Sequence, residues 1–297
     1  MSKFKGLGVA MVTPFNANGE IDFPALEKLT NFLIDGGVDY LVVQGTTGES
    51  PVLDKNEKQA VLDTVCKVNN NRTPVVFGIG GNNTKSVIND LNTFNLTEVD
   101  GILSASPYYN KPTQDGIYAH YAAIAEATDL PIILYNVPGR TASNISVETT
   151  LKLANSYDNI IAIKEASGSM EQIMEIILNK PDDFLVISGD DAITLPILAA
   201  GGDGVISVVG NAFPHAFKDM VKNGLEGNFE TARRSHYAVL PIISHLFAEG
   251  NPAGIKESLA DISIMEPHLR LPLVNVSQER KAKILELGRN INKAFPY

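Results

Sequence analysis

Short runs of apolar residues recur along the first two thirds of the chain. Eight of them are continuously apolar rather than alternating with polar positions, and they span residues 7–11, 40–43, 74–77, 101–103, 131–134, 160–163, 184–187 and 204–208. Continuous apolar runs of this length are typical of parallel strands that are buried on both faces of a sheet. The pattern therefore predicts eight buried parallel strands.

Helical patterns fill the intervals between these strands. Side chains suited to cap a helix stand at Asp22, Asp54 and Ser169, and Glu57 completes the capping-box pattern that begins at Asp54. A strand–helix unit repeated eight times is typical of a (β/α)8 TIM barrel, an α/β fold. A doubly wound sheet fits less well, because no dinucleotide-binding glycine loop follows the first strand.

The last part of the chain lacks the strand pattern. After about residue 225 only helical patterns remain, with Asn228, Asn251 and Ser277 as candidate helix starts. We therefore expect a catalytic barrel at residues 1–225 and a C-terminal helical region at 226–297. The helical region would cover one side of the barrel or mediate oligomerisation.

Composition and charge narrow the class of protein. The chain has 297 residues, of which 44% are hydrophobic and 20% charged, as in folded globular proteins. A net charge of −10 would repel a polyanion, so no nucleic acid partner is expected. No apolar run approaches the roughly 18 residues of a membrane span, and no secretory signal is present. We expect a cytoplasmic protein without a membrane partner.

Cysteine and histidine usage gives little support to other kinds of site. The single cysteine, Cys66, has no partner for an internal disulfide and is expected to be a packed thiol rather than a nucleophile. The five histidines show no metal-binding spacing, so no metal site is expected. Asp190 and Asp191 follow the seventh strand and suit either a cation or a helix cap, of which the cap is the simpler interpretation.

The sixth strand runs directly into Lys164. Catalytic groups of a (β/α)8 barrel lie at the C-terminal ends of its strands, which makes this position informative. Burial favours the neutral amine of a lysine, and a neutral amine attacks a ketone or aldehyde to form a Schiff base. The alternative is that Lys164 pairs with a carboxylate or marks the point where the strand meets solvent.

Three other strand ends carry polar or aromatic groups. Tyr135 ends the fifth strand and Arg140 follows it, so that a phenol able to relay a proton stands near a guanidinium able to hold a carboxylate. The turn after the second strand, at residues 44–50, could face an oxyanion with its hydroxyls and amides, or be an ordinary capped turn. Tyr108 and Tyr109 follow the fourth strand and suit a substrate wall, a subunit contact or a hydrophobic plug.

Taken together, these segments resemble the dihydrodipicolinate synthase family of pyruvate-dependent class I aldolases. The resemblance lies at residues 45–49, 108–110, 135–141, 164–168, 188–191 and 204–207. It implies condensation of pyruvate with L-aspartate 4-semialdehyde to 4-hydroxy-tetrahydrodipicolinate, in the biosynthesis of diaminopimelate and lysine. It further implies a homotetramer, built as a dimer of dimers, that needs no cofactor.

The same resemblance implies a role for each site residue. Lys164 would form the Schiff base with pyruvate, while Tyr135 and Thr47 relay protons together with Tyr109 of a neighbouring subunit. Arg140 would hold the carboxylate of the semialdehyde. The pyruvate pocket would be lined by Thr46, Thr47, Gly189 and Ile206.

Three other functions stay open on the sequence. N-acetylneuraminate lyase, or another aldolase of the same superfamily, would use the same lysine, but Arg140 and the Thr46-Thr47 pair follow the synthase pattern. A barrel that binds a small carboxylate without turning it over would have no need of a reactive lysine. A barrel isomerase with Lys164 as an electrostatic clamp would usually show a glycine-rich phosphate loop.

The resemblance also covers a possible effector site. In family members that lysine inhibits, the effector pocket resembles four residues of this chain: Ser50, Pro51, Asn82 and Tyr108. A histidine and a glutamate complete that pocket, whereas this chain has Lys58 and Ser86 at those places. Because a cation replaces a neutral donor and the acidic partner of the effector's amine is missing, we expect weak or no inhibition by lysine.

Overall fold

Eight parallel strands close into a barrel in the computed structural model, which describes residues 3–296. The strands follow one another around the barrel in chain order, and the eighth pairs with the first. Their bounds are β1 Gly6–Ala10, β2 Tyr40–Val43, β3 Val75–Gly78, β4 Gly101–Ala105, β5 Ile132–Asn136, β6 Ile160–Glu165, β7 Leu185–Ser188 and β8 Gly204–Ser207. The predicted (β/α)8 fold is confirmed, and every predicted strand forms within two residues of its expected bounds.

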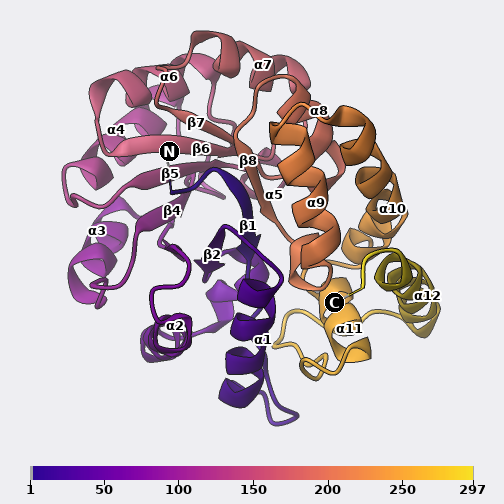
Figure 1. Cartoon of the computed structure of the whole chain (residues 1–297). Coiled ribbons are helices and arrows are strands. Elements are labelled where there is room, and N and C mark those ends of the chain that lie inside the picture. The colour runs from indigo at the N-terminus through magenta and orange to yellow at the C-terminus, as the bar shows by residue number, and fades with distance from the viewer. Residues whose placement is uncertain (1–2, 297) are drawn as a thin grey trace.

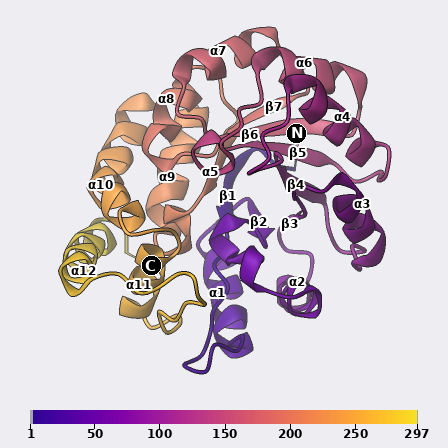
Figure 2. The same cartoon turned by 180° about the vertical axis from the view of Figure 1, so that it is seen from behind.

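Helices follow each strand and form a ring around the barrel (Figure 1). Figure 2 shows the C-terminal helices on one flank of the molecule and α3 and α4 on the other. The helices are α1 Phe23–Asp35, α2 Lys55–Asn69, α3 Thr84–Thr93, α4 Gln114–Ala125, α5 Pro138–Thr141, α6 Val147–Ser156, α7 Met170–Asn179, α8 Thr194–Ala199, α9 Pro214–Leu225, α10 Phe229–Phe247, α11 Ala253–Asp261 and α12 Gln278–Ala294.

The capping signals explain most of the helix starts. Asp22 accepts a hydrogen bond from the Ala25 backbone at the start of α1, and the capping box of Asp54 and Glu57 forms in both directions at α2. Ser169 likewise caps α7 and Ser277 caps α12. These four starts are confirmed.

The helix expected from Asn251 forms, but its N-cap is one residue later than expected. Helix α11 begins at Ala253 with Pro252 in the N-cap position. The side chain of Asn251 does not cap the helix, because its amide nitrogen donates instead to the hydroxyl of Thr47. An asparagine before a proline has the pattern of a helix start, and only the tertiary contact reveals its actual partner.

The barrel interior is filled by side chains near the amino ends of the strands. Tyr40 is fully buried there and meets the ring of Phe4 edge-on, with 5.7 Å between the ring centroids. Gly8 is the register partner of Tyr40, and a Cβ atom at Gly8 would lie 2.2 Å from the Tyr40 ring. The glycine therefore makes room for the tyrosine.

The C-terminal helices pack against one side of the barrel. Helix α10 lies against α9, while α12 packs on both α10 and α11. Buried apolar residues of α10, including Val239 and Ile242, belong to the same hydrophobic core as the barrel helices. Between residues 3 and 296, none of the helices has both the length and the apolar character needed to cross a membrane.

Candidate functional site

Lys164 and Tyr135 are register partners on the neighbouring strands β6 and β5. Alternation along the strands turns both side chains into the barrel at its carboxyl end. The Lys164 Nζ atom lies 4.3 Å from the centroid of the Tyr135 ring, and the two residues are only 5% and 6% exposed. The amine thus faces an aromatic ring rather than bulk water, with the phenol beside it.

The neighbouring carboxylate, Glu165, does not pair with Lys164. It points to the opposite face of β6 and is fully buried. Its oxygens accept hydrogen bonds from the Ser167 backbone at 2.7 Å, from Gln172 Nε2 at 2.9 Å and from Asn136 Nδ2 at 3.0 Å. No ion pair within residues 3–296 involves Lys164. Neither pairing with a carboxylate nor contact with solvent therefore describes this lysine.

Gly189 gives the Lys164 side chain its space. A Cβ atom at Gly189 would lie 3.1 Å from both Cγ and Cε of Lys164 and 2.7 Å from the Cβ of Ala166. The Gly189 backbone donates to the Glu165 carbonyl at 2.8 Å, which fixes it against the end of β6. Ile206 is 1% exposed and belongs to the cluster of apolar side chains inside the barrel.

The turn after β2 folds as a short 3-10 helix, Thr46–Gly48. Thr13 donates its hydroxyl to the Gly48 carbonyl at 2.6 Å and so ties this turn to the segment after β1. Thr47 is buried, and its Oγ1 atom accepts a hydrogen bond from Asn251 Nδ2 at 3.0 Å. Thr46 is half-buried at the cavity described below.

A buried ion pair anchors the same turn. Glu49 follows in the left-handed conformation, with φ of 54°, and its Oε1 atom lies 2.5 Å from Lys256 Nζ. The Arg270 backbone donates to the other carboxylate oxygen at 3.1 Å. Burial lowers the pKa of Lys256 to about 8, although the nearby Glu49 carboxylate works in the opposite direction. Neither Asn251 nor Lys256 is predicted from the sequence to be part of the site, because both contacts join distant segments of the chain.

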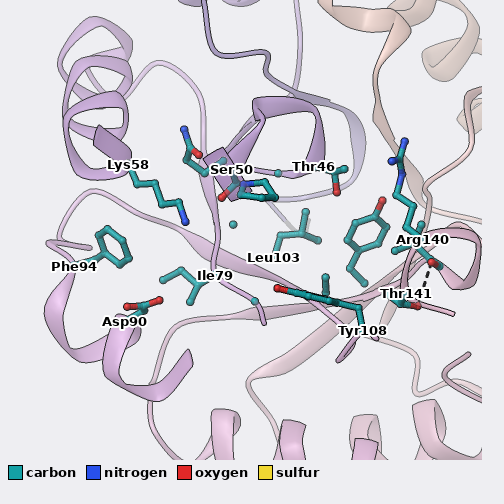
Figure 3. A pocket seen from close by; sticks show the side chains of 18 residues that line it. Thr46, Ser50, Lys58, Ile79, Asp90, Phe94, Leu103, Tyr108, Arg140 and Thr141 are labelled. Carbon is teal, nitrogen blue, oxygen red and sulfur yellow. Dashed lines mark hydrogen bonds between the residues drawn. The ribbon is translucent and has the colours of Figure 1, made fainter. Parts of the chain in front are cut away.

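A cavity of about 420 Å³ opens at the carboxyl end of the barrel (Figure 3). Of the predicted site residues, seven line it: Thr46, Ser50, Pro51, Lys58, Tyr108, Tyr135 and Arg140. Figure 3 shows Arg140, Thr141 and Thr46 at one end and Lys58, Asp90 and Phe94 at the other. The arrangement supplies a cationic group at each end and the Tyr135 phenol on the wall.

The remaining predicted residues lie away from this lining. Thr47, Lys164 and Ile206 are buried in or near the barrel end, Gly189 is half-buried, and Asn82 and Ser86 are exposed. Tyr109 is 87% exposed, with φ of 72°, and only its backbone is held, by a hydrogen bond to the Thr141 carbonyl at 3.4 Å. Within one copy of residues 3–296, its ring does not line the cavity.

The effector region contains a carboxylate, that of Asp90, which is not among the predicted site residues. Asp90 lies one helical turn after Ser86 on α3 and reaches the cavity that Lys58 also lines. Burial lowers the pKa of Lys58, and the Asp90 and Asp54 carboxylates oppose that effect. Lys55 approaches Asp90 as well, with 3.7 Å between Nζ and Oδ1. The spacing of four residues after Ser86 is the signal that could have identified Asp90.

Asp190 and Asp191 both act as hydrogen-bond acceptors for the backbone. Asp190 accepts from the Ala192 backbone at 2.9 Å, as a cap does. Asp191 accepts from the backbones of Val208 and Val209, each at 3.0 Å, and burial raises its pKa to about 6. Among residues 3–296, no group of three or more acidic, histidine or cysteine side chains could hold a metal ion.

Cys66 is a buried thiol on α2. It packs in the main hydrophobic core at 4% exposure. Burial raises the pKa of its thiol to about 12, and nearby carboxylates add to the effect. A thiol that stays protonated at neutral pH is a weak nucleophile, in line with the expected packing role.

Residues 3–290 match the model of the Dihydrodipicolinate synthetase family. The chain is 49% identical over 293 residues to a 4-hydroxy-tetrahydrodipicolinate synthase of Flavobacterium psychrophilum, covering 99% of this chain and 100% of that protein. Its structure is similar to that of dihydrodipicolinate synthase from Aquifex aeolicus, with a TM-score of 0.94, 40% identity, and coverage of 99% and 100%. It is also similar to the chloride-inhibited dihydrodipicolinate synthase of Acinetobacter baumannii complexed with pyruvate, with a TM-score of 0.94, 34% identity, and coverage of 97% and 99%.

Proposed function

The chain belongs to the dihydrodipicolinate synthetase family, and from this premise we propose that it condenses pyruvate with L-aspartate 4-semialdehyde to 4-hydroxy-tetrahydrodipicolinate. The observation that carries the proposal is the placement of Lys164. This lysine is buried at the carboxyl end of β6, free of any carboxylate within residues 3–296, and faces the Tyr135 ring at 4.3 Å. An amine in these surroundings is suited to attack a carbonyl carbon.

The first half of the reaction builds a nucleophile from pyruvate. Lys164 Nζ attacks the keto carbon, water leaves, and a Schiff base forms. Loss of a proton from the methyl group then gives an enamine. In this proposal Tyr135 and Thr47 carry protons in these steps: the phenol adjoins the amine, and the threonine lies on the turn after β2 at the same end of the barrel.

The second half joins the enamine carbon to the aldehyde carbon of the semialdehyde. Arg140 lines the cavity and holds the carboxylate of this substrate by a two-pronged hydrogen bond. Attack of the substrate's amino group on the Schiff-base carbon closes the ring and returns Lys164 to the free amine. Arg140 favours this substrate over the sugar acid of N-acetylneuraminate lyase, which must fit a long polyol.

Tyr109 completes the proton relay from a neighbouring subunit in this proposal. Its ring is 87% exposed and lies outside the cavity of its own chain, as a residue that acts across an interface would. The homotetramer, the division into residues 1–225 and 226–297, and the cytoplasmic location stay predictions.

Lysine is proposed to bind this enzyme weakly. Lys58 places a positive charge where the resembled effector pocket has a histidine, and Ser86 offers no carboxylate to the effector's amine. Asp90 does not replace that carboxylate, because two cations of this chain already interact with it. Lys55 Nζ lies 3.7 Å from its Oδ1 atom, and the Asp90 charge also acts on Lys58.

Reduction of the Schiff base tests the proposed function. Incubation with pyruvate and borohydride should add about 72 Da to the intact protein, at Lys164 alone. Lys164→Ala should abolish the adduct, whereas Lys58→Ala, which removes another lysine of the cavity region, should keep it. Semialdehyde added before the reductant should consume pyruvate and give the cyclic product.

Two outcomes would contradict the proposal. If the folded protein forms no adduct, Lys164 is not a nucleophile, and the remaining interpretation is a barrel that binds a carboxylate without turnover. An adduct that does not react with the semialdehyde would leave the aldolase chemistry but exclude this second substrate.

A further inference from the structure

Asn251 contacts the proposed proton relay from a distant part of the chain. Its Nδ2 atom donates to Thr47 Oγ1 at 3.0 Å across a separation of 204 residues. The two residues are 7% and 2% exposed, so water does not compete for this contact. No other side chain within residues 3–296 forms a hydrogen bond with this hydroxyl.

The direction of this hydrogen bond determines where the threonine proton points. A hydroxyl has one proton to donate and lone pairs that accept. Since the Asn251 amide occupies a lone pair of Thr47 Oγ1, the hydroxyl's own proton is turned away from the asparagine. An acceptor in place of the amide NH2 would instead capture that proton and withdraw it from reacting groups.

The surrounding contacts keep Asn251 in this position. Lys256, on the helix that follows Asn251, forms the buried pair with Glu49, two residues after Thr47. The turn after β2 is therefore joined at two points to the C-terminal region, once to the residue pair before α11 and once to α11 itself. Gly254 adds close packing, because a Cβ atom there would lie 2.5 Å from the Leu246 carbonyl oxygen.

We propose that Asn251 is a positioning residue, whose amide holds the Thr47 hydroxyl so that its proton is offered to the reacting groups. The inference rests on the relay role of Thr47 in the proposed function. Asn251 itself is assigned no contact with either substrate. Its effect on the rate passes through Thr47.

Two substitutions separate positioning from packing. Asn251→Asp keeps the size of the side chain but presents only acceptors when ionised, so it should capture the Thr47 proton. Asn251→Ala removes the contact altogether. Each should lower kcat by about 10²-fold at pH 8, with the KM for pyruvate changed by less than about threefold.

The pH profile supplies a readout that packing alone does not move. Protonation of the introduced carboxylate in the Asn251→Asp variant restores a donor toward Thr47, so the ratio of variant to wild-type kcat should rise as the pH falls. The ratio for Asn251→Ala should stay flat. The Asn251→Ala variant introduces no charge, so it controls for the titration of the nearby Lys256, whose pKa is lowered to about 8.

Asn69 provides a matched control. It is a buried asparagine at the end of α2 whose Nδ2 atom donates to the Thr73 carbonyl at 2.7 Å. Asn69→Asp should affect stability without changing kcat per folded molecule. An Asn251→Asp enzyme with wild-type kcat at every pH, or a loss explained by the amount of folded protein, would overturn the proposal.

Exchange of the pyruvate methyl protons with deuterated water, followed by NMR, separates this inference from the proposed function. The exchange requires the enamine but not the second substrate. Wild-type exchange without condensation would contradict the proposed product, while slower exchange in both Asn251 variants would still support positioning. If both variants exchange the methyl protons as fast as the wild type, the positioning role of Asn251 is refuted and the proposed function is not affected.

Discussion

The Nζ atom of Lys256 and the Oε1 atom of Glu49 lie 2.5 Å apart, and neither side chain is exposed to solvent. Removing one partner from such a pair leaves an uncompensated charge in the interior. We expect Lys256→Met to lower the free energy of unfolding by about 3–5 kcal/mol, measured by urea denaturation. The double variant with Glu49→Gln should lose less than the sum of the two single variants.

A surface pair serves as the control for this prediction. Arg234 and Glu230 are 76% and 77% exposed and lie 2.8 Å apart on α10. Arg234→Ala should cost less than about 0.5 kcal/mol. A Lys256→Met variant as stable as Arg234→Ala would show that the buried pair does not anchor the turn.

The Tyr135→Phe variant should separate the two roles of Tyr135, which are proton transfer by its phenol and contact of its ring with Lys164. The phenylalanine ring keeps the face on which Lys164 lies, so stability and the pyruvate adduct should persist. Without the phenol, kcat should fall by at least about 10²-fold. Tyr118→Phe is the control, because Lys152 lies 4.2 Å from that ring, far from the cavity lining. Equal kcat in the two variants would remove Tyr135 from the relay.

Gly189→Ala should crowd the lysine. The new Cβ atom would meet Ala166 at 2.7 Å and Lys164 at 3.1 Å, so the amine must move. We expect a destabilisation of about 1–3 kcal/mol and at least tenfold slower adduct formation. Gly81→Ala, where the nearest atom would be 3.5 Å away, should change neither quantity. Adduct formation at the wild-type rate in Gly189→Ala would contradict the proposed position of the reactive amine.

Inhibition by lysine should be weak in the wild type and stronger in Lys58→His/Ser86→Glu. The double substitution removes a cation and adds a carboxylate for the effector's ammonium group, which should strengthen inhibition about tenfold or more. Lys67→His, an exposed lysine in the last turn of the same helix, should have little effect. A low-millimolar inhibition constant in the wild type would contradict the expectation, as would an insensitive double variant.

Acid should destabilise the protein through His120. Burial lowers the pKa of this imidazole to about 4, whereas in the unfolded chain it lies near 6.5. Between these values the unfolded state binds more protons, so stability falls as the pH falls, by at most roughly 1.4 kcal/mol per pH unit. Asp191 contributes with the opposite sign, because its raised pKa of about 6 favours the folded state at low pH.

The His120→Gln variant isolates that contribution. Its stability, measured by urea denaturation from pH 7 to pH 4, should fall less steeply than that of the wild type. Parallel curves for wild type and His120→Gln would show that His120 is not buried neutral.

Local patterns were enough to predict the barrel and the residues at its strand ends. The continuous apolar run before Lys164 placed that lysine at the end of β6, and the register of β5 and β6 places Tyr135 opposite it. The run places Lys164 from the sequence alone, whereas the register that sets Tyr135 opposite it comes from the structure. The assignment of roles to them came from the resemblance.

Contacts between distant segments could not be predicted in the same way. Asn251 has the local pattern of a helix start, yet its partner is Thr47. Lys256 lies on α11, most of whose residues are buried whether apolar or charged, and the local sequence does not indicate that burial. Asp90 is a different case, because it lies four residues after Ser86 on the same helix. Its place near the effector region could therefore have been predicted from the sequence.

The contact between Asn251 and Thr47 also has a consequence for the order in which the protein becomes active during synthesis. All eight strands are complete by Ser207, well before the ribosome reaches Asn251. The helices after β8 contribute buried residues to the same hydrophobic core as the barrel helices. We therefore expect turnover to begin only after the segment around Asn251 has been synthesised and has packed against the turn that holds Thr47.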